Sequence, residues 1–255
     1  MSAAALHIVR ETAVRIWLKT LRRPMPLSFS FVQPLFWMLI FGFLFHRFTL
    51  GEAYAGLSYL EFILPGICAM TVLFGASQAG VNMVRDLHSG FIQRMARASN
   101  HPGWIMIGWI GAEVARLLLQ AVVVCLLGIA LGARLHVHPG IILAVAGLAV
   151  FAFAYASLSC WIALKGGAHE SMAVFVHVVN MPLLFTSTAL VPSRQMPGWL
   201  EWTARWNPLT LVADALRETL ILGQMPDALK LLPLLLLGVL LFVLARREMA
   251  HAAYD

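Results

Sequence analysis

Charged residues are scarce in this chain. Only 12% of the 255 residues are Asp, Glu, Lys or Arg, whereas 60% are hydrophobic, and the mean hydropathy is +0.82. This composition excludes one or two ordinary soluble domains and is typical of an all-α polytopic membrane protein. Cysteine is also rare. Cys68, Cys125 and Cys160 lie inside apolar runs without C-x-x-C or Cys/His spacing, which indicates small buried residues and neither a disulfide framework nor a metal site.

Catalytic and nucleotide-binding motifs are missing as well. The chain has no G-x-x-x-x-G-K-[ST] phosphate loop, and its nine histidines include no H-E-x-x-H. We therefore expect no enzyme activity and no cofactor from this chain alone. The net charge of +6 comes from basic residues beside hydrophobic runs, so it indicates contact with membrane lipids and not with nucleic acid.

Six hydrophobic segments are long enough to cross a membrane, which takes about 20 apolar residues. If the N-terminus is cytoplasmic, eleven Lys and Arg residues in the loops and at the span ends face the cytoplasm, and six face the opposite side. This bias predicts that both termini are cytoplasmic, within a single domain covering residues 1–255. The predicted spans are residues 29–47, 59–82, 104–131, 139–163, 171–191 and 228–245.

Residues 1–25 are predicted to form an amphipathic helix on the inner membrane surface. A generic anchor and a regulatory or partner-binding role are both open for this segment. Leu6, Val9, Ala13, Ile16 and Trp17 fall on one side of the helical wheel, and Glu11, Arg15, Lys19 and Arg22 fall on the other.

The inner loop between spans two and three contains a second amphipathic segment. Gly90 ends the preceding helix, and an apolar stripe follows with Arg94 and Arg97 beside it. The stripe predicts a short helix that either docks in a partner's groove or lies on the lipid headgroups. The stripe consists of Phe91, Ile92, Met95 and Ala98.

Polar residues inside the spans are candidates for a translocation path or for contacts between helices. Glu113 and Arg116 are spaced i, i+3 in span three, which favours a structural ion pair over a proton relay or substrate site. Most of the others are expected to join helices by hydrogen bonds. The path candidates are Thr71, Gln78, Asn82, His177, Asn180 and Thr186.

The segment between spans five and six is predicted to be a helical re-entrant element at the outer surface. Trp199, Trp202 and Trp206 share one helical face, and indole favours the headgroup level of a membrane. Asn207-Pro208 has the pattern of an N-cap followed by proline in the first turn. Asp214, Arg217 and Glu218 follow at i, i+3 and i+4, which indicates either a surface ion pair or part of an outer gate.

These residues also resemble the signature of the type-2 ABC exporter permeases. The resemblance extends to FVQPLFWMLIFGFLF in span one, YLEFILPG at span two and the loop from Asp86 to Gly90. Span one is most similar to the drug-export and nodulation-factor-export branches. The signature residues are Phe185, Thr186, Ser187, Pro192, Pro197, Trp199, Asn207, Pro208 and Arg217.

The resemblance implies the membrane subunit of an exporter in the inner membrane of a bacterial cell. Such permeases act as homodimers with two copies of a separate ATP-binding subunit, which binds ATP and Mg. They move a lipophilic or amphipathic drug, lipid or glycolipid outward by alternating access. The helix after Gly90 would be the coupling helix, and spans two and five would line the path at the dimer interface. The family often has Glu-Arg before the glycine, where this chain has Arg85-Asp86.

An alternative is a stand-alone secondary transporter that draws on an ion gradient. Glu61, Glu113 or His177 would then carry the coupled proton or bind the coupled ion. No internal repeat is evident in the sequence, which weakens this alternative.

Overall fold

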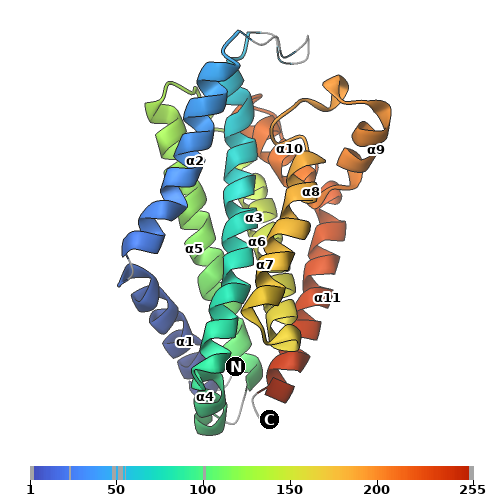
Figure 1. The fold of residues 1–255 in the computed structure, drawn as a ribbon. Coiled ribbons are helices and arrows are strands. Elements are labelled where there is room, and N and C mark those ends of the chain that lie inside the picture. The colour runs from blue at the N-terminus through green and yellow to red at the C-terminus, as the bar shows by residue number, and fades with distance from the viewer. Residues whose placement is uncertain are drawn as a thin grey trace.

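The computed structural model describes residues 3–22, 24–47, 50, 54, 56–99 and 102–252, and every regular element in these ranges is a helix. This confirms the all-α expectation. Most of the helices run side by side as an elongated bundle (Figure 1). They are α1 (Ala3–Leu21), α2 (Pro24–Leu44), α3 (Tyr59–His88), α4 (Phe91–Ser99), α5 (Pro102–Ala130), α6 (Ile141–Gly166), α7 (His169–Val178), α8 (Asn180–Phe185), α9 (Gly198–Trp206), α10 (Pro208–Leu220) and α11 (Ala228–Ala252), with a 3-10 turn at Ser193–Gln195.

Helix α3 is the centre of the bundle. Its most apolar 18-residue window is 83% buried, against 39%, 50% and 22% for the corresponding windows of α5, α6 and α11. Helices α2, α5, α6, α7 and α10 all pack against it. Within the described ranges, α3, α5, α6 and α11 are long and apolar enough to cross a membrane, and they match the predicted spans 59–82, 104–131, 139–163 and 228–245.

The other two predicted spans differ from expectation to different degrees. Helix α2 occupies the first span, with a shorter apolar stretch at Ser30–Leu44. The fifth span, predicted as one helix over residues 171–191, is instead α7 followed by α8, with an interruption at Val179. Pro182 explains the break, because it has no N–H to donate to the carbonyl of Val178 and its ring crowds that turn. The chain then leaves the helical conformation after Phe185.

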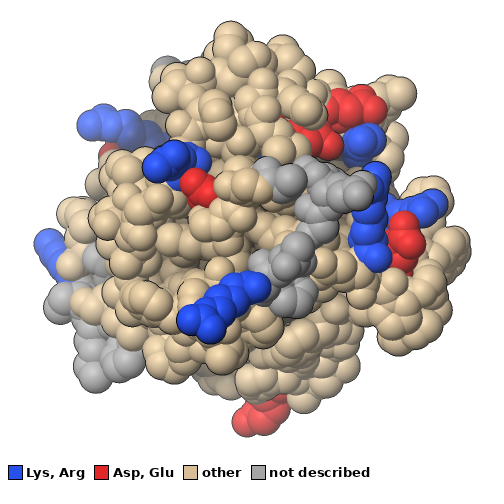
Figure 2. Space-filling view, turned by 90° about the horizontal axis from the view of Figure 1, so that it is seen from above, with Lys and Arg blue, Asp and Glu red and all other residues tan. Residues whose placement is uncertain are grey.

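The bundle has two distinct ends. Both chain ends, α1 and α4 lie at one end, which we call the near end, and α9 and α10 lie at the other, which we call the far end (Figure 1). Seen from above, the surface is mostly uncharged with scattered charged side chains (Figure 2). On α9, the three indoles are 65–75% exposed, so they form an outward-facing apolar surface as the sequence predicts.

Helix α1 packs along α5 with a face that the sequence only partly predicts. Ala5, Thr12 and Ile16 are buried, whereas Leu6, expected on the apolar side, is 59% exposed. Gly108 of α5 accounts for this orientation. A Cβ at Gly108 would lie 2.7 Å from the Val9 carbonyl oxygen, so its absence allows the two backbones to approach closely.

The far end is held by side chains of the signature segment. The Asn207 side chain accepts a hydrogen bond from the Leu209 N–H at 2.8 Å, which confirms the predicted N-cap. Its amide nitrogen donates to the Leu183 carbonyl at 2.7 Å and to the Thr186 hydroxyl at 3.0 Å. Asn207 therefore joins the start of α10 to the end of α8.

Arg217 is buried, which corrects the expectation of a surface ion pair. It is 1% exposed and pairs with Asp214 within α10. It also donates to the Phe62 carbonyl at 3.2 Å and the Thr188 carbonyl at 2.8 Å, and its guanidinium lies 4.1 Å from the Phe62 ring centroid. The reason is that α10 packs directly on α3 and α6, so this face of the helix never reaches solvent.

Replacing Arg217 tests this arrangement. We expect Arg217→Ala to lower the free energy of unfolding by about 2–4 kcal/mol, because two buried carbonyls and Asp214 lose their partner. Arg205→Ala is the matched control, since Arg205 forms an exposed pair with Glu201 and should contribute no more than about 0.5 kcal/mol. Unfolding in mixed micelles, followed by tryptophan fluorescence, measures both. Equal losses in the free energy of unfolding of the two variants would contradict a structural role for buried Arg217.

Candidate functional site: a cavity between the helices

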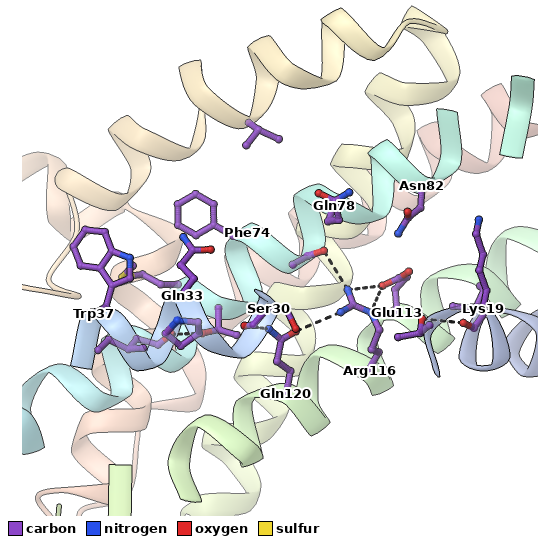
Figure 3. Close-up of a pocket in the computed structure, with 18 of the residues that line it drawn as sticks. Lys19, Ser30, Gln33, Trp37, Phe74, Gln78, Asn82, Glu113, Arg116 and Gln120 are labelled. Carbon is purple, nitrogen blue, oxygen red and sulfur yellow. Dashed lines mark hydrogen bonds and ion pairs between the residues drawn. The ribbon is translucent and has the colours of Figure 1, made fainter. Parts of the chain in front are cut away.

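A cavity of about 580 Å³ lies between α1, α2, α3, α5 and α7. Its side chains include amides, hydroxyls, aromatic rings and basic groups (Figure 3). Among the described residues, no three His, Cys, Asp or Glu side chains gather as a metal site. This mixture of polar, basic and aromatic side chains is suited to binding a small molecule. The lining includes Lys19, Ser30, Gln33, Trp37, Ile67, Met70, Thr71, Phe74, Gln78, Asn82, Arg85, Glu113, Arg116, Gln120 and His177.

Four of the six predicted path residues line this cavity. Thr71, Gln78 and Asn82 come from α3, and His177 comes from α7. Gln78 and His177 are exposed in spite of their position within the bundle, because they face this opening. The structure thus brings together polar residues from predicted spans two and five.

Asn180 does not reach the cavity. It is fully buried, where it accepts a hydrogen bond from the Tyr155 hydroxyl and donates to the Ser77 hydroxyl at 2.8 Å. It therefore connects α3, α6 and α8 and does not line this cavity, so its role in a translocation path stays a prediction. Thr186 also lies outside the cavity lining, in the turn after α8, where it donates to the Pro182 carbonyl and accepts from Asn207.

The predicted pair of Glu113 and Arg116 forms part of the cavity wall. The Arg116 Nη2 lies 2.8 Å from Glu113 Oε2, and Arg116 also donates to the Gly75 carbonyl of α3 at 3.3 Å. Arg116 also donates to the side-chain Oε1 of Gln120 at 3.3 Å, and the Gln120 side-chain Nε2 donates to the Ser30 backbone carbonyl of α2 at 2.9 Å. This network joins three helices, which agrees with a structural ion pair.

A carboxylate shared by two basic side chains lies beside the near end of the cavity, outside its lining. Asp86 pairs with Arg15 and with Lys19, each at 2.7 Å, and its side chain is 5% exposed. The Arg15 guanidinium also lies 3.3 Å from the centroid of the Phe91 ring. Asp86 therefore joins α1 to α3, and Arg15 extends the contact to α4. The sequence placed Arg15 and Lys19 on the polar side of an interfacial helix, and the structure shows that both side chains bind Asp86 of α3.

Helix α4 is packed on the protein by part of its expected docking stripe. Gly90 has φ +64°, a conformation that favours glycine and allows the sharp turn from α3. Ile92 is fully buried, and Met95 packs against Ala96 and Ile105. The expectation that the whole stripe faces a partner is wrong for Ile92. The exposed face consists instead of Arg94, Arg97 and Ala98.

Several residues that line the cavity were not predicted from the sequence. Gln33 is a single polar residue before Pro34 in an apolar run, and Trp37 and Phe74 have the pattern of ordinary core aromatics. Gln120 had a detectable signal, because it lies at i+4 from Arg116 on the same helical face. Lys19 could not be placed here without knowing that α1 packs along α5.

A double-substitution cycle tests the Glu113–Arg116 network. We expect Glu113→Leu to lower the free energy of unfolding by about 3 kcal/mol, because it leaves a charged guanidinium uncompensated among buried groups. Adding Arg116→Leu should recover at least about 1 kcal/mol of this loss. Unfolding in mixed micelles measures all four proteins. Strictly additive effects of the two substitutions would contradict a coupled pair.

Comparison with known proteins places the chain in a family. The model of the family described as "ABC-2 type transporter" matches residues 9–221. A putative transport permease ycf38 from Porphyra purpurea is 31% identical over 206 residues, covering 80% of this chain and 70% of the relative. The corresponding protein from Cyanophora paradoxa is 29% identical over 220 residues, covering 85% and 76%.

A third relative agrees with the resemblance to the drug-export branch. The daunorubicin resistance ABC transporter permease protein DrrB1 from Streptomyces coeruleorubidus is 28% identical over 198 residues, covering 76% of this chain and 68% of the relative. The family match spans most of the chain, including α3, the cavity and the signature segment. The chain therefore belongs to the ABC-2 type transporter family and is a permease, the membrane component of an ABC transporter.

Proposed function

We propose that this chain is the permease of an ATP-driven exporter that moves a lipophilic or amphipathic compound out across a bacterial inner membrane. Two copies of the chain would work with two copies of a separate ATP-binding subunit, which binds ATP and Mg. The observation that carries this proposal is the direct connection between the cavity and α4. Helix α3 lines the cavity with side chains from Ile67 to Arg85, and its last turn is joined through Asp86 and Arg15 to α1 and α4.

The near end is proposed to face the cytoplasm. Helix α1, with Arg10, Arg15 and Lys19, and helix α4, with Arg94 and Arg97, lie there, and excess Lys and Arg favours the inner side of a membrane. The far end, with the exposed indoles of α9, would then lie at the outer headgroup level.

Coupling would pass through the exposed face of α4. Because Ile92 and Ala96 anchor this helix in the protein, a force on its outer face is transmitted to α3 and α1 and not absorbed by a loose loop. Arg94 and Arg97 offer a basic surface for the ATP-binding subunit, while Phe91 and Met95, both partly buried, support it from behind. Asp86 and Gly90 fix the direction in which α4 leaves α3.

The exposed apolar face of α7 and α8 supports a dimer. Three large side chains of this face, Val174, Val178 and Phe185, are 60–64% exposed. The cavity lies beside this face, because His177 of α7 is part of its lining. We propose that the second protomer packs near this face, so that α3 and α7 of both copies border a common path. Binding of ATP would close the ATPase pair and shift the two halves from inward-open to outward-open.

A secondary transporter has weaker support. Glu113 is paired with Arg116, and Glu61 caps the start of α3 through Ser58 and also accepts from the Arg134 backbone N–H at 3.1 Å. Both carboxylates are thus engaged in structural contacts, whereas a proton carrier has to exchange its proton during the cycle.

Charge reversal on α4 tests the coupling role. Co-expression with the ATP-binding protein encoded beside this chain should yield a co-purifying complex with vanadate-sensitive ATPase activity. In Arg94→Glu/Arg97→Glu, we expect co-purification and activity to fall at least about tenfold, as two lost charge-assisted contacts imply. Arg194→Glu/Arg205→Glu, with the same charge change near α9, is the control and should behave as wild type.

Two results would count against the proposal. Wild-type activity in Arg94→Glu/Arg97→Glu would show that α4 is not the docking element. If the wild-type chain recruits no ATPase and instead moves solute under an imposed proton or sodium gradient, the secondary transporter is the correct assignment.

A further inference from the structure

The cavity has a polarity axis that is visible on α3 alone. Six of its residues, three or four positions apart, line the cavity and change from basic through amide to aromatic and aliphatic. Figure 3 shows the middle of this series, from Asn82 through Gln78 to Phe74. The series extends over about 27 Å at 1.5 Å per residue. In order from the near end, these residues are Arg85, Asn82, Gln78, Phe74, Met70 and Ile67.

The neighbouring helices follow the same axis. Lys19 of α1 lies near Asn82, whereas Gln33 and Trp37 of α2 lie near Phe74, on the other side of the Glu113–Arg116 pair (Figure 3). One end of the space is therefore basic, and the other is aromatic and apolar. A ligand that matches both ends has a polar head and an apolar body.

The charges at the basic end do not cancel. Asp86 is a single carboxylate shared by Arg15 and Lys19, so these three side chains together carry one excess positive charge. Arg85 is exposed at the cavity and forms no ion pair with any other residue that the structure describes. Glu113 is the acidic residue of the lining, and Arg116 neutralises it. Among the described residues, no carboxylate of the lining therefore neutralises Arg85 at this end of the cavity.

We propose that a single protomer binds one anionic amphiphile in this cavity, with its headgroup at Arg85 and Lys19. Its tail lies along Phe74 and Trp37, and Gln78 and Asn82 contact the region between head and tail. The volume of about 580 Å³ is within the ~300–1,000 Å³ typical of small-molecule sites. That this amphiphile is the exported compound rests on the proposed function, whereas its binding does not.

A cationic ligand fits less well. It would meet Arg85 and the excess charge at Lys19, and the one acidic group in the lining is already paired with Arg116. A neutral ligand would leave the basic end uncompensated in a site of reduced dielectric. An anionic headgroup is therefore the ligand group that neutralises the basic end of the cavity.

Native mass spectrometry of the full chain in a neutral detergent measures the binding directly. The probes are dodecyl phosphate and dodecylphosphocholine, which share tail and phosphate but differ in net charge. We expect one saturable dodecyl phosphate per chain, with a Kd at least about tenfold below that of dodecylphosphocholine. Equal Kd values for the two probes would overturn the proposal.

Two variants locate the headgroup and the tail. Arg85→Gln should raise the Kd for dodecyl phosphate about tenfold and leave that for dodecylphosphocholine unchanged, while the exposed Arg247→Gln at the same end is the control. Gln78→Trp fills the space and should abolish saturable binding of both probes. Thermal unfolding confirms that each variant is folded. Unchanged binding in either Arg85→Gln or Gln78→Trp would place the probe on the surface and overturn the proposal.

A competition experiment identifies the source of the amphiphile. Displacement of dodecyl phosphate by phosphatidylglycerol but not by phosphatidylethanolamine assigns the site to an acidic membrane lipid. Dodecyl phosphate that stays bound in the presence of phosphatidylglycerol assigns it to a single-chain anionic solute. Both results support the anionic site, and both are obtained without an ATPase. A failure of ATPase coupling therefore does not contradict the anionic site, and a loss of dodecyl phosphate binding does not contradict the coupling role of α4.

Discussion

Burial of α3 is the constraint on which the rest of the structure depends. A helix surrounded on all sides has to satisfy its polar groups within the protein, because neither water nor lipid can do so. The Ser159 hydroxyl accepts from the Gly80 N–H and donates to the Ser77 carbonyl, each at 2.9 Å, and a Cβ at Gly80 would lie 2.5 Å from the Ser159 carbonyl oxygen. Close contact with α6 and internal hydrogen bonding are thus achieved together.

The same helix carries a charged connection at each end. Near one end, Asp86 binds α1, and near the other, the Phe62 carbonyl receives Arg217 of α10. Between them, α3 lines the cavity and accepts Arg116 at the Gly75 carbonyl. A displacement of α4 therefore meets a continuous, well-packed element and not a flexible linker. In the proposed mechanism, α3 transmits the movement of the ATP-binding subunits to the cavity and to the far end.

The sequence predicted those features that depend on local pattern. Hydropathy located four spans that the structure contains, helical spacing identified the Glu113–Arg116 pair, and Asn207-Pro208 marked the start of α10. It could not predict what tertiary packing decides. Arg217 and Ile92 are buried by helices distant in sequence, Asn180 turns toward Ser77 and away from the cavity, and the basic face of α1 is drawn to Asp86. The break at Val179 follows from Pro182, whereas hydropathy alone predicted one continuous span over residues 171–191.

Site-specific crosslinking from α4 tests the central claim most directly. A benzophenone amino acid in place of Arg97, introduced into cells that express the chain with its genomic neighbours, is irradiated and the adducts are identified by mass spectrometry. The account predicts an adduct with a protein that contains a G-x-x-x-x-G-K-[ST] loop, and none with that protein when the same group replaces Trp202 at the far end. Adducts with lipid alone at position 97 would contradict a permease driven through α4.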